Sequence, residues 1–368
     1  AHALAPTPAE RRAAVRATFM NPPVDAAARL ALAGLETRWG SSGQGWNAVR
    51  DLPADSAAAA AWVAFGELAE MDGRWAQART AFERALGWRE GDALRMRAAT
   101  AAYASGDAAG AIAVAPWPRA MPDSQRVAMD LLPLHVMALA QLRRPDEAAR
   151  LVTAFDRHLA PGMRMMLARE VAMGWVRQGE LARARAALAV DGAEADSSAA
   201  AGWLALFEGD AQTARAMLGR GDEQSAEIAL ALAVLARFRD ASAPAVGRAF
   251  LTLAQGDTAA AAARFTDAAD AAPGAASLLL LTAARFHLVV GDTARAAALW
   301  SDLVMKHAES AEAPEALLHH ARVLLARGDR GAAMQQLERL VLAYPASALV
   351  PVARRELEAA REAAGQGR

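Results

Sequence analysis

The chain has 368 residues, 54% of them hydrophobic and 5% aromatic, and its 40 basic side chains nearly balance 41 acidic ones. This balance provides no global field for nucleic acid or an anionic membrane, and the absence of cysteine excludes disulfides and thiolate metal sites. Because alanine dominates the hydrophobic share and strict alternation of apolar and polar residues is rare, the composition predicts an all-α protein.

Two helices are predicted before the first regular repeat. Residues 7–10 (T-P-A-E) place an N-cap, a proline and an acidic residue in the order typical of a helix start, so a helix is expected to run to about Met20. A second helix is expected over 25–39, and the glycine- and serine-rich run at 40–45 is predicted to be a flexible loop. We assign residues 1–53 to an N-terminal helical cap.

The stretch 62–85 is typical of one helical hairpin. Small residues at Gly66 and Ala78 allow two antiparallel backbones to approach closely, and a turn at Asp72-Gly73 separates the two helices. Aromatic side chains are expected to fill the space around this contact: Trp62, Phe65 and Phe82.

The same spacing of turn residue and small residues recurs along the chain. A turn glycine lies five residues before an alanine at Gly73 and Ala78, Gly106 and Ala111, Gly179 and Ala184, Gly209 and Ala214, Gly256 and Ala261, Gly291 and Ala296, and Gly328 and Ala333; Arg143 with Ala148 takes the same frame. Seven residues before each turn a small residue recurs, at Gly66, Ala99, Ala172, Gly202, Ala249, Ala284 and Ala321, with Val136 the exception. Two small positions at a fixed separation, repeated at intervals of 30 to 47 residues, predict eight hairpins.

The first hairpin resembles the tetratricopeptide repeat, whose pattern is W-x2-L-G-x2-Y, then A-x3-F, then P. Trp62, Gly66, Ala78 and Phe82 match, while Phe65, Ala69 and Glu90 stand in place of the Leu, Tyr and Pro. The resemblance implies a right-handed superhelical solenoid over residues 54–348, in which the first helix of each hairpin lines a concave groove.

The regular spacing is interrupted in two places and ends in a third. The long interval after Gly209 leaves room for an extra helix near 223–239, and prolines at 116–118 cut the second hairpin short. Residues 349–368 are assigned to a C-terminal capping helix and tail, because a terminal repeat would otherwise expose its apolar side.

The last two hairpins resemble the repeats of bacterial periplasmic proteins of the Tol-Pal-associated cell-division coordinator and outer-membrane assembly type. The resemblance lies in residues 314–317 (P-E-A-L), Gly328-Asp329 and 344–347 (Y-P-A-S). It implies a protein-binding scaffold in the cell envelope. The start at Ala1-His2-Ala3 fits a cleaved signal peptide, so export to the periplasm is expected, with the cytoplasm as the alternative.

The titratable residues do not form a recognisable catalytic or metal-binding motif. His319 and His320 are adjacent on a predicted helix and point about 100° apart, which disfavours a shared metal. Glu309, Glu312 and Glu315 surround a helix start, where negative charge complements the helix dipole. We therefore expect no catalytic residues, no metal and no cofactor, and a chain that is not an enzyme.

The remaining functional feature is the predicted groove. Its candidate partner-binding residues lie on the first helices of the hairpins: Arg169, Met173, Trp203, Phe207, Phe250, Arg285, Leu288 and Arg322. Methionine, aromatic and arginine side chains suit a partner helix or an extended acidic peptide. The alternative is that the stack itself buries the apolar members, with the extra helix covering Trp203 and Phe250.

These features predict a non-enzymatic protein-interaction scaffold, with no nucleic-acid partner and no transmembrane segment. A role as a subunit of a larger envelope complex fits this prediction. Two other functions stay open. One is a solenoid accessory to a cell-wall enzyme such as a lytic transglycosylase, and the other is a cytoplasmic regulator that senses a peptide or a small ligand.

Overall fold

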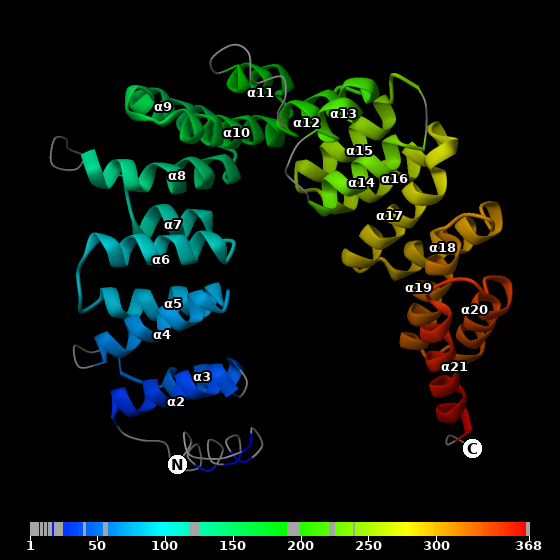
Figure 1. Cartoon of the computed structure of the whole chain (residues 1–368), viewed down its shortest axis with the longest axis horizontal. Coiled ribbons are helices and arrows are strands. Elements are labelled where there is room, and N and C mark those ends of the chain that lie inside the picture. The colour runs from blue at the N-terminus through cyan, green and yellow to red at the C-terminus, as the bar shows by residue number, and fades with distance from the viewer. Residues whose placement is uncertain are drawn as a thin grey trace. The chain divides into compact units, whose positions relative to one another are not determined.

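The computed structural model describes residues 7, 10, 13, 17, 25–39, 42–53, 58–117, 125–189, 199–220, 225–237 and 240–365. All regular elements within these ranges are helices, and the extended contacts there amount to one isolated bridge between Asp210 and Ser242. The prediction of an all-α chain built from helical hairpins is confirmed (Figure 1).

Eight hairpins follow one another in the described chain, each with a first helix, here the A helix, and a second, the B helix. Their bounds are α4 Ala59–Met71 with α5 Trp75–Leu86, α6 Asp92–Ala104 with α7 Ala108–Val114, α8 Gln125–Gln141 with α9 Pro145–Phe155, α10 Pro161–Gln178 with α11 Leu181–Leu188, α12 Ala199–Phe207 with α13 Ala211–Leu218, α15 Pro244–Ala254 with α16 Thr258–Ala271, α17 Ala276–Val289 with α18 Thr293–Lys306, and α19 Ala313–Ala326 with α20 Arg330–Ala343. Short 3-10 turns, η2 Asp156–His158 and η4 Pro273–Ala275, follow two of the B helices.

The predicted turn residues end the A helices by adopting the left-handed conformation. All seven glycines have positive φ: Gly73, Gly106, Gly179, Gly209, Gly256, Gly291 and Gly328. Arg143, predicted to occupy the same position, is the one non-glycine residue with positive φ in the described chain, at 57°. After Gly73, the Arg74 N–H donates to the Ala69 carbonyl at 2.8 Å, which closes a Schellman cap.

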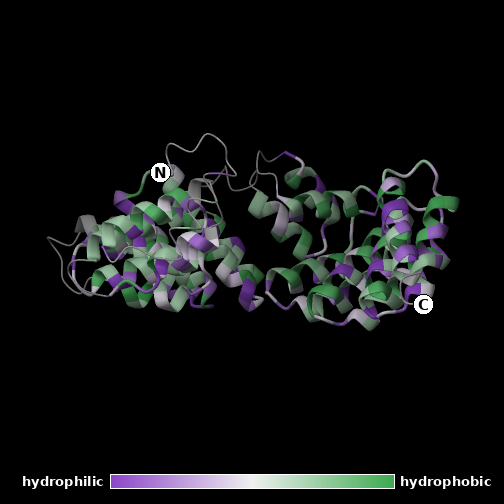
Figure 2. Cartoon of the chain, turned by 90° about the horizontal axis from the view of Figure 1, so that it is seen from below, coloured by the Kyte–Doolittle hydropathy of each residue, from purple (hydrophilic) through white to green (hydrophobic). Residues whose placement is uncertain are grey.

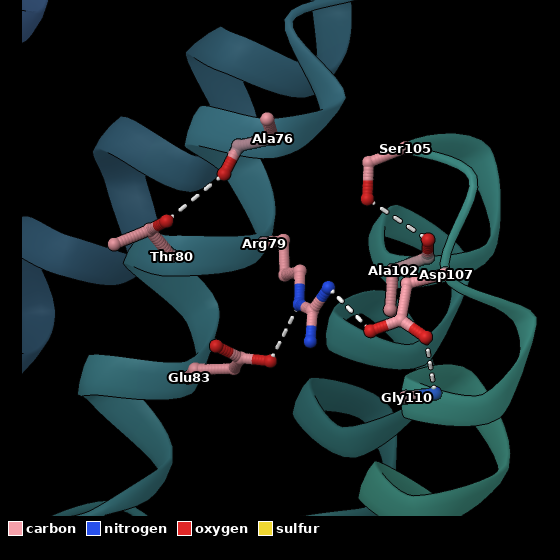
Figure 3. A network of polar contacts seen from close by, with 8 residues as sticks. All are labelled: Ala76, Arg79, Thr80, Glu83, Ala102, Ser105, Asp107 and Gly110. Atoms are coloured by element: carbon pink, nitrogen blue, oxygen red, sulfur yellow. Dashed lines mark hydrogen bonds and ion pairs between the residues drawn. The ribbon is translucent and has the colours of Figure 1, made fainter.

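The acidic residue that often follows the turn glycine caps the B helix. Asp107 accepts a hydrogen bond from the Gly110 N–H at 2.7 Å and also pairs with Arg79 of the preceding hairpin at 2.8 Å (Figure 3). The Gly110 N–H and, after it, Arg79 lower the pKa of Asp107. Four more aspartates cap B helices in the same way: Asp210, Asp257, Asp292 and Asp329. The glycine and the aspartate therefore divide the turn between them, one ending the A helix and the other starting the B helix.

The predicted small positions lie where A and B helices touch. All eight B-helix alanines of the repeated pattern are 0% exposed: Ala78, Ala111, Ala148, Ala184, Ala214, Ala261, Ala296 and Ala333. A Cβ added to Gly66 would lie 2.4 Å from Cε1 of Phe82, and one added to Gly202 would lie 2.9 Å from Cγ of Leu218. Side chains larger than hydrogen are excluded at these two positions because the facing helix occupies the space.

The chain divides into two compact units, Ala1–Gly174 and Trp175–Arg368, and the division falls within α10. Within each unit the hairpins stack in sequence order (Figure 1). B helices pack against the A helix of the next hairpin, as α5 does on α6 and α7 on α8 in the first unit, and as α16 does on α17 and α18 on α19 in the second. This pattern of neighbour-to-neighbour contact is the packing expected of a solenoid.

In the N-terminal region, residues 1–53, the structure describes some of the predicted elements and differs from the prediction at one loop. Thr7 and Glu10 exchange hydrogen bonds as a capping box, whereas most of the predicted helix up to Met20 lies outside the described residues. The second predicted helix is α2 Ala26–Trp39. The expected flexible loop is wrong over its last four residues, since α3 Ser42–Val49 occupies them. Helix forms there because Trp46 packs against the first hairpin, with its ring centroid 5.7 Å from that of Phe65.

The predicted irregular elements are present. The extra helix is α14 Ala226–Leu235, capped by Ser225 and packed against α13. The second hairpin has the short B helix α7, whose cluster of buried residues contacts Trp117. The capping helix is α21 Val350–Gly365, which packs against α20.

Hydrophobic and hydrophilic residues are mixed along the helices of each unit (Figure 2). No single helix in the described ranges is both long and apolar enough to cross a membrane. Two consecutive helical segments, Thr258–Ala271 and Pro273–Val289, are together long and apolar enough to span a membrane by length and composition, but the chain bends by 119° between them.

Candidate functional site

The A helices expose a stripe that begins one residue after each small position. We call these positions the A-face: Glu67, Thr100, Met137, Met173, Trp203, Phe250, Arg285 and Arg322. Seven of the eight are at least partly exposed, and Phe250 is buried. The stripe is separated from the hairpin contact by about 100° of helix rotation, so a side chain there is free to meet another molecule.

The aromatic part of the A-face lies mainly in the core. The ring of Trp203 stacks on Phe207 at 5.7 Å and contacts Phe250 at 5.8 Å, so the structure brings these three predicted residues together. However, Phe207 is 5% exposed and Phe250 is 2% exposed, and Phe250 packs edge-on against Phe265 at 5.1 Å. The expectation of an open aromatic patch is therefore wrong for Phe207 and Phe250, and Trp203 alone of the three keeps partial exposure.

The element that buries Phe250 differs from the one expected. Phe265 belongs to α16, the B helix of the same hairpin as Phe250, whereas α14 packs against α13. Backbone approach adds to this burial, because a Cβ on Gly247 would lie 2.2 Å from the carbonyl oxygen of Leu206 in α12. Hairpin packing, and not the extra helix, removes this side chain from solvent.

The basic end of the A-face is neutralised by the following helices. Arg322 forms three hydrogen bonds to Glu356 of α21, the shortest at 2.6 Å, and Arg285 pairs with Glu315 of α19. Both arginines are exposed. The predicted positive extension of the groove is thus a ladder of ion pairs between successive A helices, with little net charge for an acidic peptide.

The acidic cluster at the start of α19 bridges helices. Glu315 has its pKa lowered to about 2, first by the hydrogen bond from His319 and then by Arg285, although burial opposes the shift. His319 also stacks on Trp300, with ring centroids 5.5 Å apart. Glu315 lies in the first turn of α19, where its negative charge complements the helix dipole as expected, and its oxygens are held by side chains as well.

Glu312 is 7% exposed and joins three elements of the second unit. It accepts hydrogen bonds from Arg237, just after α14, at 2.6 Å and from Ser277 of α17 at 2.8 Å. Burial raises its pKa, but these two donors outweigh burial and leave the pKa lowered. Sequence reasoning missed this contact, since 75 residues separate Arg237 from Glu312 and no local spacing links them.

The other predicted partner-binding residues keep partial exposure. Arg169 and Met173 lie on the same face of α10, and the Arg169 Nε is buried with no hydrogen-bond partner. Leu288, on α17 of the second unit, is 36% exposed. These side chains remain candidates for contact with a partner.

The histidines serve packing where the structure describes them. His135 is 3% exposed, and its Nε2 lies 2.7 Å from the Ala115 carbonyl oxygen. Burial lowers the pKa of His135. Across the described ranges, no three His, Asp or Glu side chains lie close enough to hold a metal ion.

Comparison with known proteins finds neither a matching family model nor a matching curated protein. Solved structures do match. The Naa15/Naa10 complex bound to HypK-THB is 12% identical with a TM-score of 0.35, and the alignment covers 93% of this chain and 62% of that one. The P58(IPK) TPR domain is 12% identical over 98% of this chain and 94% of that chain, with a TM-score of 0.27. The APC/C hetero-tetramer Cut9-Hcn1 is 13% identical over 96% and 85%, also with a TM-score of 0.27.

Proposed function

We propose that this chain is a non-enzymatic scaffold that binds a partner protein along the A-face of its hairpins. The observation that carries the proposal is that neighbouring positions of each A helix differ in burial. The small position is buried in every hairpin, whereas the next residue keeps exposed surface in seven of the eight, Met173 and Trp203 among them, with Phe250 the exception. Side chains that the stack does not need, repeated along successive helices, form the kind of surface that a partner helix or an extended segment contacts.

The bacterial cell envelope is the proposed location, with the periplasm as the compartment. Support comes from the resemblance of residues 314–317 and 344–347 to periplasmic repeats. Fractionation of the native host followed by N-terminal sequencing of the mature protein tests this. Recovery from the cytoplasm with an uncleaved leader would favour the regulatory alternative instead.

Site-specific photo-crosslinking tests the A-face. A benzophenone side chain is placed at Met173, Trp203 or Leu288, and matched controls carry it at Asp267 and Gln335, which are exposed on B helices. The expected result is a crosslinked protein from each of these three test positions and none from the controls. Crosslinks confined to the B-helix positions would overturn the proposal.

Replacement of the central aromatic residue measures its contribution. Trp203→Ala is expected to weaken binding of the crosslinked partner at least about tenfold, as loss of an indole anchor typically does. Because Trp203 also contacts Phe207 and Phe250, the thermal midpoint of the variant must be measured beside its affinity. A peptidoglycan turnover assay on the purified complex tests the accessory role with a cell-wall enzyme.

A further inference from the structure

Methionine is concentrated in one part of the chain. Eight of the 13 methionines lie between positions 96 and 173, and the seven that the structure describes there belong to three successive A helices: Met96 of α6, Met129 and Met137 of α8, and Met163, Met165, Met166 and Met173 of α10. None of the seven is buried. Large apolar side chains that keep exposed surface, gathered on adjacent helices, require an explanation beyond core packing.

On α10 the methionines share one stripe. With 100° per residue, Met163, Met166 and Met173 fall within about 80° of one another, and the buried side chains of Ala168 and Ala172 lie on the opposite side of the helix. Met163 is 38% exposed and Met166 is 37% exposed. The stripe therefore faces away from the hairpin contact.

The two preceding A helices present equivalent stripes. On α8, Met129 and Met137 are separated by eight residues and by about 80° of rotation, and both remain partly exposed. On α6, Met96 has the same partial exposure and packs against the cluster of buried residues to which Leu131 and Leu134 of α8 belong. Each stripe includes or adjoins the residue after the small position, so the three lie on the same side of the stack.

The three helices are neighbours in the first unit. Helix α6 packs on α8, and a Cβ on Gly174 of α10 would lie 3.2 Å from Cα of Ala140 in α8 and 3.0 Å from Cβ of Pro145. Packed helices are 8–10 Å apart, so three successive A helices span about 20 Å. At 1.5 Å per residue, this width accommodates a crossing helix of about 13 residues.

A charged group lies at the edge of this surface. Arg169 is four residues before Met173 on α10, and its Nε is buried without a hydrogen-bond partner. A buried donor left unpaired is unfavourable, and a guanidinium pairs best with a carboxylate. The Arg169 side chain as a whole is partly exposed, so its guanidinium can pair with an acidic residue beside the apolar face of an occupant.

We propose that this methionine face, comprising Met96, Met129, Met137, Met163, Met166 and Met173 together with Arg169, docks an amphipathic helix of a partner protein. The inference rests on the proposed function and names its partner class. Large apolar side chains of the helix contact the thioethers, which are flexible and polarizable enough to repack around them. A carboxylate flanking that apolar face pairs with Arg169.

Peptide binding tests the proposal directly. The probe is a fluorescein-labelled synthetic helix of about 13 residues with leucines on one face and glutamates flanking them, and its scrambled sequence is the control. Fluorescence anisotropy is expected to show binding of the probe alone. Met166→Glu is expected to weaken it about tenfold, whereas Met305→Glu, at a site 65% exposed on α18, leaves it unchanged.

The charge and the sulfur are tested separately. Arg169→Gln should weaken the glutamate probe about fivefold and leave a glutamine-flanked version unaffected. Hydrogen peroxide transfers one oxygen atom to a thioether sulfur and leaves water, so oxidation makes the face polar and should weaken binding in the natural protein. Leucine in place of Met163, Met166 and Met173 keeps the volume, so that variant should retain binding and lose its peroxide sensitivity.

Equal binding of probe and scrambled peptide, or equal effects of the Met166 and Met305 substitutions, would overturn the docking of a helix at the methionine face. If the probe fails in this way while Leu288 still crosslinks to a partner, the scaffold proposal stands and only the methionine face is wrong. Absence of crosslinks at every A-face position would overturn both the scaffold proposal and the methionine-face proposal.

Discussion

The A helices of the two units share the same kinds of residue at their buried positions and differ at their exposed positions. In the first unit, the exposed stripes of α8 and α10 carry methionine. In the second, the stripes of α17 and α19 carry Arg285 and Arg322, whose charges are compensated by carboxylates of α19 and of the capping helix α21. Since both units share turn glycines and small packed positions, the stack leaves the stripe free to vary. The exposed stripe is therefore where binding specificity can differ along one repeated framework.

The largest expected effect concerns the close backbone contact of the second unit. Gly247→Ala places a methyl group against the Leu206 carbonyl oxygen, where a Cβ would lie at 2.2 Å, and should cost about 4 kcal/mol of unfolding free energy. Gly66→Ala in the first unit meets the Phe82 ring and should cost about 2 kcal/mol, because a side chain yields more readily than backbone. Urea denaturation followed by circular dichroism measures both.

Gly331→Ala is the matched control for these two glycines. Its Cβ has one neighbour, an Asp329 oxygen at 4.0 Å, and it lies within α20. The substitution should stabilise by about 0.5 kcal/mol. Destabilisation of Gly331→Ala as large as that of Gly247→Ala would show that alanine is harmful for a reason other than crowding.

The next prediction compares the buried carboxylate Glu312 of the second unit with an exposed ion pair of the same unit. Glu312→Gln removes the charge that holds Arg237 and Ser277, and loss of a charged hydrogen bond in a buried site costs about 2 kcal/mol. Glu338→Gln breaks an exposed pair with Arg361 and should cost less than about 0.5 kcal/mol. Equal losses in denaturant unfolding would mean that burial does not distinguish the two carboxylates.

The first unit should respond to mild acid through His135. Burial lowers the folded-state pKa of His135 below its ordinary 6.5, so the proton binds the unfolded chain more tightly. Stability is full above pH 6.5 and falls as the pH drops below that value, until the folded-state pKa is passed. Urea midpoints at pH 8 and pH 5 should differ more in the natural protein than in His135→Gln, and an unchanged difference would exclude His135 as the cause.

The second unit should respond at lower pH through Glu315. Its folded-state pKa is about 2, below the ordinary 4.5, so its contribution is complete above pH 4.5 and is lost as the pH falls toward 2. Glu315→Gln should lower the urea midpoint at pH 6 and have little effect near pH 2. A constant difference between the two proteins across this range would contradict the link to ionisation.

The smallest effect is expected from the ion-pair ladder itself. Arg322 is 45% exposed and Glu356 is 25% exposed at their side chains, and pairs of this kind contribute at most about 1 kcal/mol. Arg322→Ala should lower the thermal midpoint slightly in dilute buffer and less in 1 M salt, where screening weakens the pair. A loss that salt does not reduce would indicate that the arginine stem, and not its charge, is the important contact.

The sequence by itself determined the hairpins and their turns. Glycine relieves the steric cost of positive φ, so Gly73 and its six equivalents could be identified from spacing alone. Alanine or glycine at two fixed separations marked the A and B contacts for a comparable reason, since a close helix crossing leaves no room for more. The identity of α14 and α21 as additional helices also followed from local pattern.

Tertiary structure alone decided which side chains stay at the surface. Phe250 and Trp203 occupy the same repeat position, yet Phe265 covers the first and leaves the second partly exposed. Residues 42–45 read as a loop but form helix, because Trp46 gains a packing site on the first hairpin. Burial and charge pairing are set by neighbours on other helices, of the same hairpin or of another. A periodic pattern indicates the repeat position of a residue but not which side chains lie against it.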